Sequence, residues 1–172
     1  MNYYDERKEC MNNYNEEYIA RYFGDQISIR IKEKELTKWY VGYYCEIGQK
    51  ELNECLRGDR IANPWQLILL GELLECSVNE LLGFGYYYEH FDAPASEILY
   101  AKTKLAELFW DHVNTLTEEL GISVEEMAKQ TGCSVYTVIN WQRGRRATYP
   151  KSYVMVRICK ALGCTPSDLL GY

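Results

Sequence analysis

The sequence predicts an all-α protein in which a small helical bundle occurs twice in tandem. Apolar residues recur at helical spacing, and serine and threonine caps stand directly before the apolar stretches. A shift of 86 residues also aligns 19–27 with 105–113 in apolar type, which indicates an internal repeat. We therefore expect four segments, which are an N-terminal tail at 1–18, a first domain at 19–84, an aromatic linker at 85–101 and a second domain at 102–172.

The repeat rests on spacing and apolar type, because identity between the two copies is low. The same shift aligns the Arg-Gly pair at 57–58 with the pair at 143–144. A shift of 88 then aligns CSVNELLGF at 76–84 with CTPSDLLGY at 164–172. The difference of two residues fits a longer basic loop after Gly144 in the second domain.

The second domain opens with a helix at about Lys104 to Leu120. Its apolar residues recur every three or four positions, as expected for a helix with one buried face. They are Leu105, Leu108, Phe109, Val113 and Leu116. Ser123 caps the next helix and Glu126 follows three residues later, which is the pattern of a capping box. Met127 and Ala128 are expected to face inward.

The third helix of this domain is predicted from about Val135 to Arg143. Ser134 caps it, and Gly144 can adopt the left-handed conformation that ends a helix. Val138 and Trp141 fall on one face and are expected in the core. The other face is partly apolar, which indicates a surface that becomes covered. It carries Val135, Tyr136, Ile139 and Asn140.

Two further helices close the domain. The first is expected at about Lys151 to Leu162, with four residues facing inward. These are Val154, Ile158, Ala161 and Leu162. The ending ALGCTPSDLLGY predicts a short last helix after a threonine or serine cap, with Pro166 in its first turn. Leu169 and Leu170 are expected to complete the core.

The two capped helices, the tight turn at 132–134 and the basic loop after Gly144 resemble the lambda-repressor-like helix-turn-helix family, the Cro/C1 or Xre-type group. The resemblance covers about Lys104 to Tyr172. It implies a bundle of five helices, so the expected fold is all-α with two tandem five-helix bundles, the first of them a degenerate copy. It also implies a sequence-specific DNA-binding transcriptional regulator, a repressor of phage or mobile-element type, whose partner is double-stranded DNA.

Carried over by position, the resemblance implies that Val135, Tyr136 and Asn140 face base edges. Asparagine can pair with adenine through two hydrogen bonds, and apolar side chains can cover a thymine methyl. Phosphate contacts are implied for Thr137, Arg143, Arg145, Arg146, Thr148 and Tyr149. The chain departs from the family at Val124, where a glutamine that donates to a phosphate is common. An apolar side chain cannot make that contact.

In the first copy the corresponding helix is Gln49 to Arg57, with Gly48 as a poor cap. The weaker candidates for DNA contacts in this copy are Gln49, Lys50, Arg57 and Arg60. Carboxylates lie close to them at Glu46, Glu51, Glu54 and Asp59. A carboxylate near a polyanion costs binding energy unless it accepts from a cytosine amine. We therefore expect this copy to pack against the other copy, to form a homodimer or to bind a protein partner.

Charge is divided unevenly along the chain. Residues 1–101 hold 10 Lys and Arg against 18 Asp and Glu, whereas 102–172 hold 9 against 7. The net charge of -6 and the pI of about 5.1 lie far from the basic norm of DNA-binding proteins. This acidity favours an alternative function, a helix-turn-helix-derived protein-interaction or inhibitor module that has lost DNA binding, such as a phage-encoded antagonist of host defence.

Other classes of protein are not indicated. The seven cysteines are odd in number and contain no C-x-x-C, which favours reduced thiols in a cytoplasm over a metal site. His90 and His112 are isolated, and the chain lacks G-x-S-x-G, H-E-x-x-H and P-loop motifs, so we expect neither an enzyme nor a cofactor. The start MNYYDERKEC has no apolar run, and no segment approaches the roughly 20 apolar residues of a membrane span.

Overall fold

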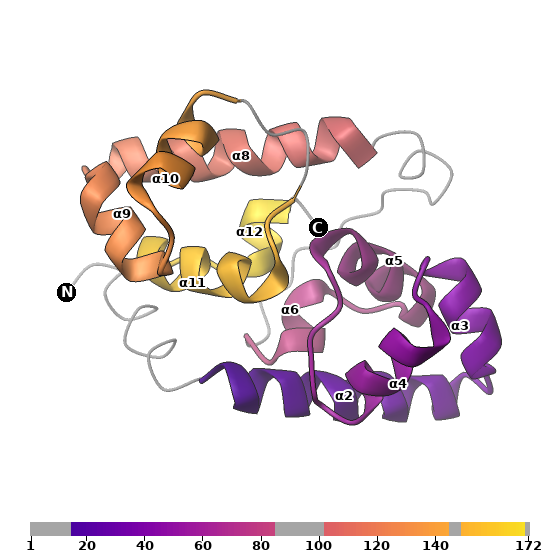
Figure 1. The fold of residues 1–172 in the computed structure, drawn as a ribbon. Coiled ribbons are helices and arrows are strands. Elements are labelled where there is room, and N and C mark those ends of the chain that lie inside the picture. Colours follow the sequence, from indigo (N-terminus) through magenta and orange to yellow (C-terminus); the bar gives the residue numbers. More distant parts are fainter. Residues whose placement is uncertain (1–14, 85–101, 145–148, 171–172) are drawn as a thin grey trace. The chain divides into compact units, whose positions relative to one another are not determined.

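The computed structural model describes residues 15–84, 102–144 and 149–170, and within these residues every regular element is a helix (Figure 1). The described chain divides into two compact units. We call residues 15–84 the N-terminal unit and the remaining described residues the C-terminal unit. The all-α class predicted from the sequence is confirmed for the described residues.

The N-terminal unit contains five helices among its described residues. They are α2 (Glu16–Glu33), α3 (Lys38–Tyr44), α4 (Gln49–Leu56), α5 (Pro64–Leu74) and α6 (Val78–Leu82). The amide of Tyr18 donates to the side chain of Asn15 at 2.7 Å, and this cap fixes the start of α2. The first helix therefore begins three residues before the expected domain start at 19.

The core of the N-terminal unit forms where α2 packs against α4, α5 and α6. Ile19, Phe23 and Ile27 follow one another at four-residue spacing in α2 and are fully buried. All residues from Pro64 to Gly71 in α5 are buried, so this helix lies at the centre of its bundle. Complete capping boxes at Asn63 and Ser77 fix the starts of α5 and α6.

The C-terminal unit has the helices that the sequence led us to expect. They are α8 (Lys102–Glu119), α9 (Val124–Thr131), α10 (Val135–Gln142), α11 (Ser152–Leu162) and α12 (Pro166–Leu170). The observed ends of α8, α10 and α11 lie within two residues of the expected ends. The Thr165 hydroxyl accepts from the amide of Asp168 at 3.2 Å, and the Asp168 carboxylate accepts from the amide of Thr165 at 2.7 Å. The cap expected for the last helix is confirmed.

One core expectation for α8 needs correction. Leu108, expected on the apolar face, is 40% exposed, whereas Trp110 is only 2% exposed. The buried stripe of α8 runs through 106, 109, 110, 113 and 117, so position 108 lies outside it. The Trp110 ring stacks on Trp141 of α10 with ring centroids 5.1 Å apart. Sequence reasoning missed this aromatic pair, which joins α8 to α10.

The only histidine in the described residues has a structural contact. Nδ1 of His112 in α8 donates to the backbone carbonyl of Leu169 in α12 at 3.1 Å. The bond ties the first helix of the C-terminal unit to its last. Among the described helices, none has both the length and the apolar character needed to cross a membrane.

Candidate nucleic-acid interface

Helix α9 starts at a serine cap, as the sequence predicted. The hydroxyl of Ser123 accepts from the amide of Glu126 at 3.1 Å. The second half of the predicted capping box does not form, because the Glu126 carboxylate accepts from the side chain of Gln130 at 2.6 Å instead. Met127 and Ala128 face inward as expected, with exposures of 1% and 5%.

The turn between α9 and α10 is supported by a side chain from α11. Gly132 ends α9 with φ of +68°, in the left-handed region. Nη1 of Arg157 donates to the carbonyl of Thr131 at 3.3 Å, and a Cβ added at Gly132 would lie 2.8 Å from that same nitrogen. The Arg157 guanidinium also lies 5.2 Å from the ring centroid of Tyr153. Arg157 therefore donates to a carbonyl at the negative end of the α9 dipole and packs against the turn.

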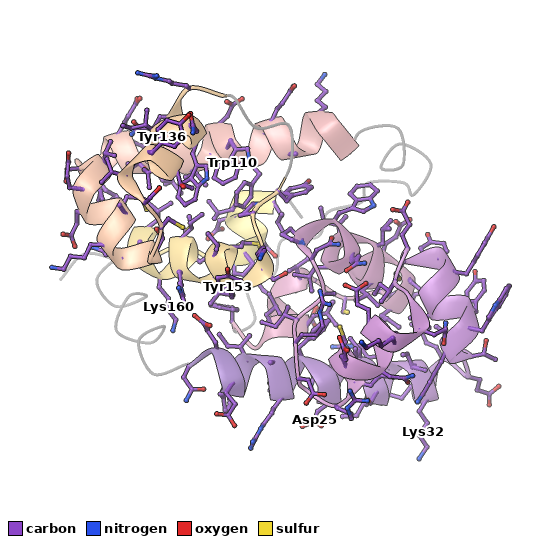
Figure 2. The ribbon with its side chains drawn as sticks, viewed as in Figure 1. Asp25, Lys32, Trp110, Tyr136, Tyr153 and Lys160 are labelled. Atoms are coloured by element: carbon purple, nitrogen blue, oxygen red, sulfur yellow. The ribbon has the colours of Figure 1, made fainter. Side chains whose placement is uncertain are left out.

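Helix α10 presents two different faces. Its cap is Ser134, whose hydroxyl accepts from the amide of Thr137 at 3.1 Å. Val138 and Trp141 are each 2% exposed. Tyr136 is 70% exposed and lies on the outer side of the helix in Figure 2. The predicted division of α10 into a core face and an outward face is confirmed for these residues.

The three remaining outward positions differ in exposure, and Ile139 is only partly exposed. Val135 is 42% exposed at the first position of α10. Asn140 is only half-exposed, and its amide oxygen is buried without a hydrogen-bond partner. Pairing with adenine requires that oxygen to accept from the base, so the amide would have to rotate outward. A buried acceptor without a partner costs about 1–3 kcal/mol, which favours such a rotation once a donor is present.

The predicted phosphate contacts are distributed over described and undescribed segments. Arg143 is exposed at the C-terminal end of α10, and the Thr137 hydroxyl lies 2.8 Å from that of Ser134. The ring of Tyr149 packs edge-on against Phe109 with centroids 5.8 Å apart, and its hydroxyl oxygen is buried. We therefore leave Tyr149 out of the interface. The predictions that fall outside the described residues are Arg145, Arg146 and Thr148.

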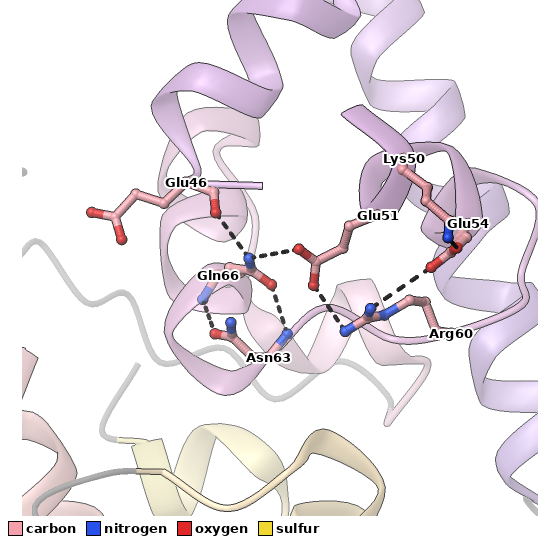
Figure 3. Close-up of polar contacts among 7 residues, drawn as sticks. All are labelled: Glu46, Lys50, Glu51, Glu54, Arg60, Asn63 and Gln66. Carbon is pink, nitrogen blue, oxygen red and sulfur yellow. Dashed lines mark hydrogen bonds and ion pairs between the residues drawn. The ribbon is translucent and has the colours of Figure 1, made fainter. Parts of the chain in front are cut away.

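In the N-terminal unit, the basic residues near α4 are paired with carboxylates. Figure 3 shows Arg60 between two glutamates of α4, with its guanidinium 2.8 Å from Glu51 and 3.7 Å from Glu54. Lys50 lies 4.0 Å from Glu54, and its side chain is 93% exposed. Arg57 pairs with Asp59 at 2.8 Å, and the amide of Gln49 donates to the backbone of Lys38 at 3.3 Å.

The buried side chain of Gln66 holds this carboxylate cluster in place. Its Nε2 donates to the backbone carbonyl of Glu46 at 3.0 Å and to the carboxylate of Glu51 at 3.5 Å (Figure 3). Its Oε1 accepts from the amide of Asn63 at 3.0 Å. Gln66 thus orients Glu51 from one side while Arg60 binds it from the other. A phosphate approaching Arg60 would have to displace these carboxylates.

Two buried thiols and one partly buried thiol of the N-terminal unit are held in the neutral form. Burial raises the pKa of the Cys45, Cys55 and Cys76 thiols to about 12 in each case. Burial also raises the pKa of the Tyr44 hydroxyl to about 12, and the nearby Glu72 carboxylate adds to that shift. Within the part of the chain that the structure describes, no group of three His, Cys, Asp or Glu side chains is placed to hold a metal ion.

Comparison with known proteins points to the same segment as the geometry does. The family model of the Cro/C1-type HTH DNA-binding domain matches residues 112–172. This range takes in the second half of α8 and all of α9 to α12. No curated protein and no solved structure matches the chain. Over residues 112–172 the chain is therefore similar to the DNA-binding domains of lambda-repressor-like regulators, which supports a DNA-binding regulator in general.

Proposed function

We propose that the protein is a sequence-specific DNA-binding transcriptional regulator whose α10 enters the major groove. The observation that carries this proposal is the outward face of α10, where Val135 and Tyr136 are exposed at the N-terminal end of a capped helix. Recognition helices of helix-turn-helix proteins contact base edges with their N-terminal residues. A tyrosine that is 70% exposed on such a helix has no packing role to explain it.

Each residue of the interface receives a role from its chemistry. Val135 and Tyr136 cover thymine methyl groups, and Asn140 pairs with adenine after its amide rotates outward. Thr137 and Arg143 contact phosphates. The loop residues Arg145, Arg146 and Thr148 are proposed as further phosphate contacts on sequence grounds alone.

We further propose that the two units are tandem copies of one bundle. Helices α2, α3 and α4 start 86 residues before α8, α9 and α10, and α5 and α6 start 88 residues before α11 and α12. These are the two offsets found in the sequence. The backbone supplies a second, independent correspondence at positions with φ of +52° to +68°. Glu35, Glu46 and Glu75 align by these offsets with Gly121, Gly132 and Gly163.

In this tandem arrangement the N-terminal unit has lost the ability to bind DNA. The position of Tyr136 is taken by Lys50 and that of Asn140 by Glu54, whose carboxylate lies close to Arg60. A phosphate contact by Arg60 would require breaking its ion pair with Glu51 at 2.8 Å. The C-terminal unit therefore reads the operator, and the N-terminal unit serves assembly.

We propose that this protein is a repressor of transcription, of phage or mobile-element type, as the resemblance implies. A promoter that carries the bound sequence and drives a reporter tests the sign of the effect. Reporter output that falls on expression of the protein supports repression, and output that rises supports activation.

A second candidate function is favoured by the surface of the N-terminal unit. In this alternative the chain is a protein-interaction or inhibitor module, such as a phage-encoded antagonist of host defence, built on a helix-turn-helix scaffold. The net charge of -6 and the paired Arg60 both oppose contact with a polyanion. One experiment distinguishes the two functions, because only a protein that recognises DNA sequence enriches particular duplexes from a random pool.

The test begins with selection of duplex oligonucleotides from a random pool at low salt. Binding of the enriched duplex is then titrated by fluorescence anisotropy at several salt concentrations. Removing one phosphate contact changes the slope of log K against log salt by about 0.9. We expect that change for Arg143→Ala. Lys50→Ala is the matched control, because Lys50 is also exposed but lies on α4.

The selection and the titration distinguish between the two proposed functions. Enrichment of a common sequence, with a changed slope for Arg143→Ala and an unchanged slope for Lys50→Ala, supports reading by α10. Equal changes for the two variants would assign DNA contact to the N-terminal unit as well. A pool that stays random at low salt, with folded protein present, would contradict DNA reading and support the protein-interaction module.

A further inference from the structure

Helix α3 carries three aromatic side chains on its solvent side. Trp39, Tyr40 and Tyr43 are 67%, 40% and 74% exposed, whereas Val41 on the opposite side is fully buried. Trp39 and Tyr43 lie one helical turn apart and stack with ring centroids 5.5 Å apart and an interplanar angle of 6°. We call Trp39, Tyr40 and Tyr43 the α3 aromatic face.

The size and composition of this face are those of an interface core. Aromatic side chains bury about 150–250 Å² each, so the exposed fractions correspond to roughly 400 Å² of aromatic surface. Apolar patches of about 300–600 Å² are the largest that typical monomers expose, and they are commonly functional. Tryptophan and tyrosine are also the residue types most enriched at binding hot spots.

The charges around the α3 aromatic face are balanced in sign. Lys38 begins α3, and Lys50 is the second residue of α4, next to Gln49, whose side-chain amide donates to the Lys38 carbonyl at 3.3 Å. Glu35 precedes α3 and Glu46 follows it, and both residues are exposed, although the Glu46 carboxylate also accepts from the indole of Trp65 at 3.3 Å. A strongly basic or strongly acidic partner would meet repulsion from half of this rim. A surface that carries both signs around an apolar centre can pair with its own copy.

We propose that the α3 aromatic face is a homodimer interface, on which a second copy of this chain docks about a two-fold axis. The aromatic rings meet at the centre, and Lys38 and Lys50 of each copy approach Glu35 and Glu46 of the other. This interface is separate from α10, and the proposal does not rest on DNA binding. Two aromatic faces bury roughly 800 Å², and the rim brings the total toward the 1,200 Å² lower limit of stable interfaces, so we expect a micromolar Kd.

The chain contains a reporter for this contact. Its four tryptophans all lie in the described residues, and Trp65, Trp110 and Trp141 are only 3%, 2% and 2% exposed. Quenching of fluorescence by acrylamide therefore reports mainly on Trp39. Sedimentation equilibrium and quenching would be measured without DNA on the full chain from about 1 to about 200 µM, a range that brackets a micromolar Kd.

We expect the mass to rise from 20.2 kDa toward twice that value, while quenching falls over the same concentration range. Tyr43→Ser should weaken dimerisation at least tenfold and keep Trp39 quenchable throughout, with no effect on the fold because Tyr43 is 74% exposed. Tyr18→Ser is the matched control. Tyr18 is 50% exposed and lies about 22 Å along α2 from the end that leads into α3.

Three results would overturn the proposal. One is a mass of 20.2 kDa and constant quenching at every concentration. Another is dimerisation of Tyr43→Ser with the affinity of the unsubstituted chain. The third is an equal loss of dimerisation in Tyr18→Ser. Failure of DNA binding would change none of these readings, because they are made without DNA.

Discussion

Replacing Gly132 by alanine should cost more stability than the same change at Gly121, and the difference measures the contact that supports the helix-turn-helix turn. Both glycines adopt left-handed backbone, with φ of +68° and +63°. A Cβ at Gly121 would meet no atom within 4 Å. A Cβ at Gly132 would lie 2.8 Å from Nη1 of Arg157 and force the guanidinium away from the carbonyl of Thr131.

The magnitudes follow from these two environments. Left-handed backbone costs an alanine about 1–2 kcal/mol, and the smaller loss of chain entropy returns about 0.5–1 kcal/mol, so Gly121→Ala should cost about 0.5–1 kcal/mol. Gly132→Ala adds the loss of a hydrogen bond from a charged donor, which contributes about 1.5 kcal/mol at the low end of its range. We take the low end because the bond is long, at 3.3 Å. The expected difference is therefore about 1.5 kcal/mol.

Urea unfolding followed by tryptophan fluorescence provides the assay. In a chain with Trp39→Phe and Trp65→Phe, the remaining tryptophans, Trp110 and Trp141, both lie in the C-terminal unit and report on it alone. Affinity for the selected duplex should also fall further in Gly132→Ala than in Gly121→Ala, because the turn sets the direction of α10. Equal losses of stability in the two variants would refute the bracing role of Arg157.

Three further predictions concern exposed and buried side chains. Tyr136→Ala should lower affinity for the selected duplex about tenfold, and it should leave the thermal midpoint of unfolding unchanged because the ring is 70% exposed. An unchanged affinity in the anisotropy titration would exclude this ring from the interface. Glu35→Gly should stabilise the N-terminal unit by about 0.5–1 kcal/mol in urea unfolding, because Glu35 has φ of +54°, and a loss of stability would count against strain there. At pH 8, iodoacetamide should modify the partly exposed Cys133 in preference to Cys45 and Cys55, because the raised pKa of about 12 keeps these two thiols protonated. The order of modification would be measured by mass spectrometry of the native protein, and the reverse order would contradict the burial of Cys45 and Cys55.

Helix boundaries in the C-terminal unit could be predicted because local chemistry determines them. Ser134 offers a hydroxyl to the amide of Thr137, and Gly144 adopts the left-handed backbone that follows α10, with φ of +60°. Both signals depend on residues within one turn of the boundary. The burial of Val138 and Trp141 followed from their three-residue spacing in the same way.

The contacts that cross between helices could not be predicted from local patterns. Arg157 reaches the turn at Gly132 from α11, and no periodicity connects a charged residue in one helix to a carbonyl in another. The same limit explains Tyr149, whose ring packs on Phe109 and whose hydroxyl is buried. It also explains Asn140, because the direction of a side-chain amide depends on neighbours outside its own helix.

The α3 aromatic face was missed for a different reason. The segment KWYVGYY contains aromatic residues at nearly every position, so its pattern does not distinguish the buried side from the exposed one. The structure separates them, with Val41 buried and Tyr43 exposed. The paired Arg60 also needed the fold, because Glu51 and Glu54 come into reach only when the segment after α4 turns back.

The most direct test of reading by α10 is a map of backbone amide shifts when the selected duplex is added. A protein of 20.2 kDa is suitable for such a measurement by nuclear magnetic resonance. We predict that the largest shifts fall at Ser134 to Thr137 and at Arg143, with α4 little changed. Shifts confined to the N-terminal unit, or spread evenly over both units, would contradict the assignment of α10 as the recognition helix.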